Sequence, residues 1–485
     1  MIEFIIKLHP EIAIKSKSVR KRQTLLLERN IKTILLRTDS NIEVNNNYDH
    51  LTIRCPSDDV AIHQQLIDRL SCIPGIVHFS EMQSSTFSSL HDIYEQVAAV
   101  YAEQIQNKTF CVRVRRAGKH DFSSIEAERY IGGGLNQLVA SAQVKLTKPD
   151  IIVALEVRKD QLIMVRKQHQ GMGGFPLPSQ SDVLSLISGG YDSAVASYLM
   201  IRKGLRTHYL FFNLGGAAHE AGVREMAHLI WQKYSLSHKV KFVSVNFAPV
   251  VDQILETIDN GLMGVVLKRM MMRAASTVAE KLGIKAIVTG ESIGQVSSQT
   301  IANLSVIDRV TETLILRPLI YQDKQEIIAL AAKIGAEDIA KSMPEYCGVI
   351  SRKPTVNAAL AEVIANEQNF DFAVLDQAVQ DAKVLDIRTI EYQAEQQADV
   401  VTVLAQLPAD AVVLDIRSPE ETDVKPLTVE GHDVVELPFF RLASQFANLD
   451  QSKHYYCYCE RGVMSRLQAV VLQEQGFKNV SVYRP

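Results

Sequence analysis

The chain has 485 residues, of which 47% are hydrophobic and 22% are charged, and its formal net charge is −3. This length predicts three or four domains of about 150 residues each, and the composition is typical of a soluble globular protein. No run of about 18 apolar residues occurs and the first residues lack a signal-peptide pattern, so we expect a cytoplasmic protein without a membrane partner. Six cysteines in so long a chain do not indicate a disulfide framework.

The small net charge hides a difference between the two ends of the chain. Residues 1–170 hold 23 Lys and Arg against 19 Asp and Glu, a surplus of +4. Residues 371–485 hold 10 against 18, which gives −8. The N-terminal part is therefore the better candidate for contact with nucleic acid.

A basic helix is predicted near the N-terminus, after a strand over residues 1–9. Between Lys15 and Arg37 there are eight Lys or Arg and one acid, Glu28. Such a run is either a solvated face or a surface for a phosphate backbone, and we select Lys21 and Arg22 as candidate RNA contacts. The apolar positions available for a core face are Leu25, Leu26, Ile31, Ile34 and Leu35.

A second αβ segment follows between about residues 77 and 168. The alternating strand 110–116 places Arg113 and Arg115 on one face, and Ser123 or Ser124 is suited to cap the next helix. Paired strands are expected over residues 151–157 and 161–165. The arrangement is similar to a THUMP domain, an RNA-binding module of tRNA-modifying enzymes, which a small ferredoxin-like domain usually precedes; an ordinary structural αβ domain is the alternative.

The stretch Ser188-Gly189-Gly190-Tyr191-Asp192-Ser193 lies between an apolar run of strand length and a helix-compatible run, residues 194–200. Two adjacent glycines let the backbone approach an anion, and the first N–H groups of a helix supply donors and a positive dipole end. The loop lacks the Lys of a Walker A motif. The sequence therefore predicts a phosphate-binding loop, with a capped Gly-Gly turn as the alternative.

This loop resembles the SGGxDS pyrophosphate loop of ATP-pyrophosphatases, enzymes that adenylate a substrate oxygen and release pyrophosphate. The resemblance implies that Asp192 binds the magnesium-nucleotide or orients the reacting groups. The residues it implies for nucleotide binding in and before the loop are Leu186, Ile187, Ser188, Gly189, Gly190 and Ser193.

Strands and helices alternate after the loop, which favours a parallel sheet with helices on both faces. In the resembling family, positions that match Lys268, Gly290 and Gln299 contact the nucleotide, with Gln299 expected on a helix after the Gly290 strand. A surface lysine on a core helix is the alternative for Lys268. Lys324 is a candidate ligand of a tRNA or nucleotide phosphate, or else part of a helix capped by Asp323.

The last residues, about 405–485, closely resemble a rhodanese domain. Cys459 is placed where a strand passes into a tight loop before a helix, and loop N–H groups with nearby arginines favour a thiolate or persulfide there. The predicted persulfide loop contains Arg461, Gly462, Ser465 and Arg466. Cys457 lies within the aromatic strand and suits a buried position, and no second ligand pair indicates a metal site.

Together these segments resemble the tRNA 4-thiouridine synthetase family in its form with a fused rhodanese domain. The expected fold is α/β multidomain: 1–63 ferredoxin-like, 64–168 THUMP, 177–370 a doubly wound parallel-sheet ATP-pyrophosphatase domain, 371–404 a linker, 405–485 rhodanese. The resemblance implies sulfur transfer to tRNA uridine with ATP and transient Mg²⁺, and it adds Cys347 as a redox partner of Cys459. No tightly bound cofactor is expected.

The partners that this resemblance implies are tRNA, a cysteine desulfurase as sulfur donor, a thiol or thioredoxin-type reductant and a thiazole sulfur-carrier protein. Two other functions stay open from the sequence. One is a rhodanese-type persulfide carrier that serves mainly a small-molecule pathway such as thiamine thiazole synthesis. The other is an ATP-pyrophosphatase for a small metabolite, which the basic N-terminal residues disfavour.

Overall fold

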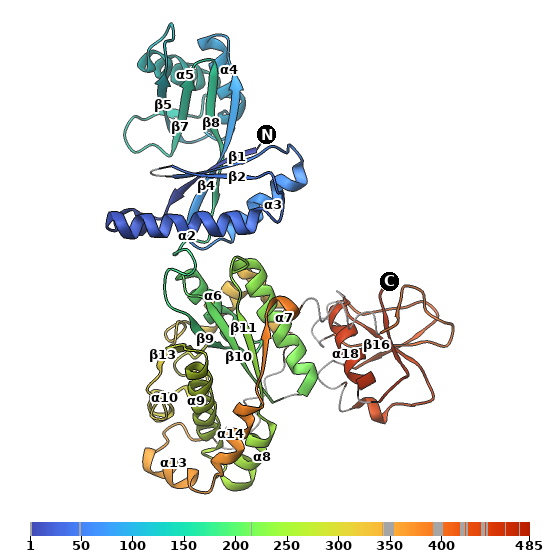
Figure 1. The fold of residues 1–485 in the computed structure, drawn as a ribbon. Coiled ribbons are helices and arrows are strands. Elements are labelled where there is room, and N and C mark those ends of the chain that lie inside the picture. Colours follow the sequence, from blue (N-terminus) through green and yellow to red (C-terminus); the bar gives the residue numbers. More distant parts are fainter. Residues whose placement is uncertain are drawn as a thin grey trace. The chain divides into compact units, whose positions relative to one another are not determined.

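The computed structural model describes residues 2–47, 50–214, 216–341, 343, 354–390, 401–417, 422, 425–437, 442, 445–460, 462–474 and 476–485. The chain divides into two compact units, Met1–Ser179 and Gln180–Pro485. Figure 1 follows the chain from blue at the N-terminus to red at the C-terminus. Within the described residues, no helix is long and apolar enough to cross a bilayer.

The first unit is built on one eight-stranded sheet with the order β2-β3-β1-β4-β8-β7-β5-β6. Its strands are β1 (Ile2–Leu8), β2 (Glu43–Asn46), β3 (His50–Cys55), β4 (Ile76–Thr86), β5 (Thr109–Ala117), β6 (Gln143–Val144), β7 (Ile151–Arg158) and β8 (Gln161–Gln170). Its helices are α1 (Pro10–Ala13), α2 (Lys17–Leu35), α3 (Val60–Ser71), α4 (Leu90–Tyr101) and α5 (Ser124–Leu138). The expected strands and helices of this part are confirmed.

Strands β4 and β8 join the two halves of this sheet. β4 pairs with β1 on one side and with β8 on the other, both antiparallel. The predicted boundary between residues 63 and 64 is wrong, because it cuts the continuous helix α3. A helix is one hydrogen-bonded unit that buries one face, so a boundary inside it separates residues that fold together.

The buried face of α2 differs from the predicted one by a small rotation. Leu27, Ile31, Ile34 and Leu35 are buried, whereas Leu25 is 38% exposed. In a run of three leucines only one can lie at the centre of a helix face. Leu27 lies four positions before Ile31, on the same face of the helix, so Leu27 is the leucine that faces the core. The basic side chains Lys21 and Arg22 are exposed, as a solvated or RNA-facing surface requires.

Strand β5 and helix α5 agree with the predicted local pattern. Val112 and Val114 are buried in a core with residues of α4 and α5, while Arg113 and Arg115 are exposed on the opposite side of the strand. Figure 1 shows α4 and α5 beside each other on this end of the sheet. Ser123 caps α5, and its hydroxyl and Glu126 form a capping box.

The second unit contains a six-stranded sheet with the order β13-β12-β9-β10-β11-β14. Its strands are β9 (Val183–Leu186), β10 (Thr207–Asn213), β11 (Lys241–Asn246), β12 (Ala286–Val288), β13 (Leu314–Leu316) and β14 (Lys383–Asp386). Its helices are α6 (Tyr191–Arg202), α7 (Gly216–Tyr234), α8 (Ala248–Thr257), α9 (Met263–Lys281), η1 (Ser297–Gln299), α10 (Ile301–Asp308), α11 (Lys324–Ile334), α12 (Glu337–Lys341), α13 (Leu360–Glu367) and α14 (Phe372–Gln380).

The strand order places a topological switch point beside β9. All pairings among β9–β13 are parallel, and β9 lies between β10, its successor, and β12, which comes much later. In doubly wound sheets, ligands bind outside the carboxyl ends of the strands at such a point. The loops after β9 and β12 are therefore the expected site.

The predicted linker over residues 371–404 is wrong for its first part. Residues 372–380 form α14, and β14 pairs antiparallel with β11 at the edge of the sheet. The physical reason is burial: Leu375, Ala378 and Val379 of α14 belong to the core that includes α8 and α9. The acidic stretch 391–400 lies outside the described residues.

The C-terminal part has a five-stranded parallel sheet of its own, ordered β15-β19-β18-β16-β17. Its elements are β15 (Val403–Leu404), β16 (Val412–Asp415), β17 (Asp433–Glu436), η2 (Phe446–Asn448), β18 (Tyr455–Tyr458), α18 (Val463–Glu474) and β19 (Val480–Tyr483). A separate apolar core fills it, with Leu414, Phe446 and Leu472 fully buried. The predicted rhodanese-type α/β fold is confirmed.

Candidate functional site

The loop between β9 and α6 adopts the geometry of an anion-binding turn. Gly189 has φ +83°, and a Cβ there would lie 2.6 Å from the Cε of Met343, so other residues are disfavoured. Gly190 is the N-cap of α6 and provides no side-chain cap. The first N–H groups of a helix have no intrahelical acceptor, so the start of α6 favours an anion.

Ser188 and Ser193 stabilise this loop internally. The Ser188 N–H donates to the Ser193 hydroxyl at 3.2 Å, and that hydroxyl donates to the carbonyl of Gly190 at 3.1 Å. His219 of α7 also bonds to the Ser188 backbone, and burial lowers the pKa of His219 to about 4 despite that bond. His219 is therefore neutral at pH 7 and adds no charge beside the loop.

Asp192, in the first turn of α6, is held by two side chains from distant loops. The Lys324 ammonium donates to both carboxylate oxygens, at 3.0 and 2.9 Å, and the Gln295 amide donates to Oδ2 at 2.9 Å. Lys324 also lies 5.5 Å from the centre of the Tyr191 ring. The structure thus places Lys324, which was expected to bind a phosphate, in an ion pair with Asp192. Lys324 is the first residue of α11, and Asp323 is the N-cap of this helix as predicted.

Gly290 lies where the loop after β12 crosses the start of α6. A Cβ at this position would lie 2.6 Å from the carbonyl carbon of Asp192 and 2.8 Å from the Ser193 nitrogen. Both neighbours are backbone atoms and cannot rotate away. Gly290 was expected to allow a nucleotide to approach the backbone closely. In the structure it allows the loop after β12 to approach the backbone of α6 closely.

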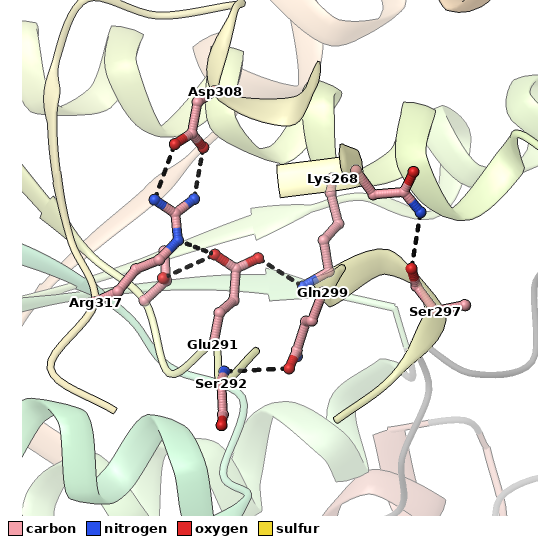
Figure 2. A network of polar contacts seen from close by, with 9 residues as sticks. Lys268, Glu291, Ser292, Ser297, Gln299, Asp308 and Arg317 are labelled. Atoms are coloured by element: carbon pink, nitrogen blue, oxygen red, sulfur yellow. Dashed lines mark hydrogen bonds and ion pairs between the residues drawn. The ribbon is translucent and has the colours of Figure 1, made fainter. Parts of the chain in front are cut away.

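Glu291 is the centre of the polar network shown in Figure 2. It is 6% exposed, accepts from Lys268 at 3.0 Å and from Arg317 Nε at 2.8 Å, and also accepts from the Thr289 hydroxyl. Burial raises the pKa of this carboxyl, but the charges of Lys268 and Arg317 outweigh burial and lower it to about 2. Lys268 is therefore not an unpaired cation, since the buried Glu291 carboxylate holds its ammonium while the side chain stays partly exposed.

Arg317 extends this network to a second carboxylate. Its two terminal nitrogens bind Asp308 at 2.9 and 2.5 Å. Burial lowers the pKa of Arg317, but the hydrogen bonds and charges of Asp308 and Glu291 outweigh it and raise the pKa. The two cations and two anions balance, so the network stabilises the strand ends without adding net charge to the site.

Gln299 lies on the short 3-10 helix η1, which follows the Gly290 strand as expected, and it is 9% exposed. Its Oε1 accepts from the Ser292 N–H at 3.2 Å (Figure 2). This bond holds the loop that carries Gly290 and Glu291.

The loops after β12 and β13 run along each other toward α6. Backbone bonds join Thr289 to Leu316 and Ile293 to Ile320, and the Ser292 hydroxyl donates to the Gln322 carbonyl at 2.8 Å. These contacts position Gln295, in the loop after β12, and Lys324, at the end of the loop after β13, so that both bind the Asp192 carboxylate.

Cys459 occupies a second loop of the same kind, after the parallel strand β18 and before α18. The Ser465 N–H donates to its Sγ at 3.3 Å, and Gly462, with φ +73°, bonds back to the Cys459 carbonyl. The Cys459 side chain is half-buried. Cys457 is fully buried, and its burial, together with the charge of a Cys459 thiolate, raises the pKa of Cys457 to about 12. The two thiols thus differ in burial as expected: Cys457 is fully buried in the strand, whereas Cys459 is partly exposed and accepts a hydrogen bond from a loop N–H.

The remaining predicted residues are placed as follows. Arg466 of α18 is half-buried, and Arg461 and Cys347 lie outside the described residues. Arg113 donates to the Leu146 carbonyl at 3.0 Å and remains exposed. The described part of the chain contains no cluster of three His, Cys, Asp or Glu that is arranged for a metal ion.

Four family models match successive parts of the chain. They are the ThiI ferredoxin-like domain over residues 3–80, the THUMP domain over 87–165, the thiamine biosynthesis protein (ThiI) over 178–372 and the rhodanese-like domain over 400–484. The tRNA sulfurtransferase of Tolumonas auensis is 59% identical over 483 residues, which span all of both chains. The chain belongs to the tRNA sulfurtransferase family.

Other comparisons agree with this membership. The tRNA sulfurtransferase of Salmonella typhimurium is 56% identical over 486 residues, again across both full chains. Among solved structures, a 4-thiouridine synthetase in a complex with RNA and ATP superposes with a TM-score of 0.66, covering 80% of this chain and 99% of its own at 24% identity. That likeness shows a shared fold.

The structure adds Glu291, Gln295, Arg317 and His219 to the site, and none of them was among the predicted site residues. For Glu291 a signal existed, because it directly follows Gly290 at the end of a buried strand, where ligand sites of parallel sheets lie. The other three come from loops and a helix whose spacing carries no such indication.

Proposed function

We propose that the chain converts uridine at position eight of tRNA to 4-thiouridine, with ATP as activator and a Cys459 persulfide as sulfur source. The observation that carries this proposal is the presence of two loops in one chain of this family. One exposes helix N–H groups beside Asp192 for an anion, and the other holds an accessible thiol at Cys459. Basic N-terminal residues supply a surface for RNA.

The activation step addresses the leaving group. The C4 oxygen of uridine is a poor leaving group, so it attacks the α-phosphorus of ATP, pyrophosphate leaves and AMP becomes the group to be displaced. The start of α6 would hold the phosphates, with Gly189 and Gly190 allowing their approach. Lys324 and Lys268 would neutralise charge when the nucleotide competes for them with Asp192 and Glu291.

Mg²⁺ fits the same corner. Asp192 offers carboxylate oxygens, and the buried Oε1 of Gln295 has no hydrogen-bond partner in the described part of the chain. Mg²⁺ binds oxygen ligands, which Asp192 would supply, and its coordinated waters need hydrogen-bond acceptors, which Gln295 would supply. When bound, Mg²⁺ would offset the negative charge that builds on the departing pyrophosphate.

The sulfur step uses Cys459. A cysteine desulfurase would transfer sulfane sulfur to it. The terminal sulfur, or sulfide displaced from it when the Cys347 thiolate attacks the Cys459 sulfur, attacks C4 as AMP leaves with its bonding electrons. On the first route C4 is joined to Cys459 through two sulfurs. Attack by the Cys347 thiolate on the Cys459 sulfur then frees 4-thiouridine and leaves a Cys347–Cys459 disulfide, which a thiol or thioredoxin-type reductant reduces.

tRNA is proposed to contact the first unit. Lys21 and Arg22 on α2, with Arg113 and Arg115 on β5, are exposed cations that would neutralise backbone phosphates. The Leu186–Ser193 stretch, Gly290 and Gln299 would surround the nucleotide, while Gly462, Ser465 and the arginines of the persulfide loop would stabilise sulfur anions.

The test combines bulk tRNA, ATP and a persulfide donor with the full chain, followed by nucleoside analysis. The proposal predicts 4-thiouridine that depends on ATP. Asp192→Ala should abolish thiolation yet retain persulfide on Cys459, and Cys459→Ala should accept no labelled sulfur. ATP-independent thiolation, or full activity of either variant, would contradict the proposal.

A second function is sulfur delivery to a small-molecule pathway, which the description of the ThiI model, a thiamine biosynthesis protein, favours. We propose that the C-terminal domain passes sulfur from Cys459 to a thiazole sulfur-carrier protein. Full-length Asp192→Ala, which is blocked only in activation, should still support thiazole formation, whereas Cys459→Ala should not. Loss of both functions in Asp192→Ala would count against separable roles.

A further inference from the structure

Gln295 is the least expected residue of the adenylation site. It lies in the loop after β12, and its amide Nε2 donates to Asp192 Oδ2 at 2.9 Å. The two residues are 103 positions apart in the chain. Gln295 therefore belongs to the site through the fold alone.

The orientation of the Gln295 amide is fixed by Asp192. If the amide were rotated by half a turn, its oxygen would face a carboxylate oxygen, and two acceptors would oppose each other. Oε1 therefore points away from Asp192. It is shielded from solvent and has no hydrogen-bond partner in the portion of the chain that the structure describes. A buried amide oxygen without a donor is costly, so a donor from a bound ligand or water stabilises this position.

The choice of ligand follows from hydrogen-bond chemistry. Phosphate oxygens of a nucleotide only accept, so they cannot satisfy Oε1. A water bound to Mg²⁺ directs its lone pairs at the ion and therefore only donates, and Mg²⁺ usually keeps several such waters. Asp192 offers carboxylate oxygens and Gln295 offers an amide oxygen, and both kinds of acceptor suit a hydrated cation.

We propose that Gln295 is a binding residue for the hydrated magnesium ion of the ATP complex: its amide N–H fixes the Asp192 carboxylate, and its Oε1 accepts from a metal-bound water. This inference rests on the proposed function, since it assigns a residue to the magnesium-nucleotide. Lys324, which bridges Asp192 in the structure, exchanges to a phosphate when the ion arrives.

The position of Gln295 is set before any ligand binds. Its loop is fixed by the Ile293 N–H on the Ile320 carbonyl at 3.1 Å and by the Ser292 contacts with Gln322 and Gln299. The Glu291 network in Figure 2 secures the start of the same loop. A ligand group held in this way loses little freedom on binding, which makes a single hydrogen bond effective.

The test measures how much Mg²⁺ strengthens binding of a non-hydrolysable ATP analogue to the full-length protein, by calorimetry with Mg²⁺ and with a chelator. In Gln295→Met the enhancement by Mg²⁺ should fall about tenfold or more, the size expected for a hydrogen bond to a charged group. Affinity without metal should change by less than about twofold, since phosphate contacts remain. Gln325→Met, an exposed glutamine at the start of α11, is the matched control and should keep the full enhancement.

A double-variant cycle separates a local role from general damage. If both residues serve one ion, Gln295→Met should have little further effect on the enhancement in the Asp192→Asn background. An unchanged enhancement in Gln295→Met, or additive effects in the cycle, would overturn the inference while leaving the proposed function intact. Absence of any binding of the analogue by the unaltered protein would instead refute the proposed function, and this inference with it.

Discussion

Replacing Gly290 by Ala tests whether the site depends on the contact between the loop after β12 and the start of α6. The added Cβ would lie 2.6 Å from the Asp192 carbonyl carbon, where ordinary contact begins near 3.4 Å. The loop must therefore retreat by about 0.8 Å, because both partners are backbone. Overpacking of this kind costs about 1–3 kcal/mol of folding stability.

The retreat should affect activity more than stability. Gln295, Glu291 and the Asp192 carboxylate all move with this contact, and a misplacement of about 1 Å at a reacting centre costs on the order of 100-fold in rate. The assay is single-turnover 4-thiouridine formation, with urea unfolding in parallel. Gly264→Ala is the matched control, since its Cβ would meet nothing within 4 Å. Gly290→Ala with a rate within about twofold of the unaltered protein would refute the reasoning.

Three further predictions concern charge and reactivity. The pKa of Glu291 is lowered from an ordinary 4.5 to about 2 in the folded protein, so its ionised carboxylate stabilises the fold by on the order of 3 kcal/mol. This stabilisation is complete above about pH 4.5 and is lost as pH falls through about 2. The free energy of unfolding of Glu291→Gln should lack this pH dependence, and equal pH profiles for the variant and the unaltered protein would contradict the prediction. Arg269→Met should lower the free energy of unfolding by about 3–5 kcal/mol, because it removes the main partner of the buried Glu367 carboxylate. Arg388→Met, which breaks a more exposed ion pair, should change the midpoint of thermal unfolding much less. Equal shifts of the midpoint in the two variants would show that burial is not the cause. Iodoacetamide at pH 8 should label Cys459 before Cys457, as judged by mass spectrometry, because burial raises the pKa of Cys457 to about 12, and labelling of Cys457 first would contradict this difference.

The sequence was sufficient where the signal is local. The SGGYDS motif follows β9 and leads into α6 as predicted, with Tyr191 as the first residue of the helix, because an apolar strand, paired glycines and a helix start are all encoded within about twenty residues. The distinction between Cys457 and Cys459 followed in the same way from strand alternation and a loop.

The pairing of charges was beyond the sequence. Lys268 and Lys324 were selected for phosphates, but which anion each one contacts depends on how β12 and β13 stand beside β9. Lys324 and Asp192 are 132 positions apart. Likewise, no local pattern shows that residues 383–386 add an edge strand to β11, since β14 gains its stability from pairing and not from its own composition.

In the proposed reaction, ATP converts the C4 oxygen of uridine into an oxygen of the departing AMP. The most direct measurement uses tRNA that carries ¹⁸O at C4 of uridine eight, with ATP and a persulfide donor, and determines the mass of the AMP released. The account predicts one ¹⁸O in AMP for each 4-thiouridine formed. Unlabelled AMP alongside 4-thiouridine would contradict it.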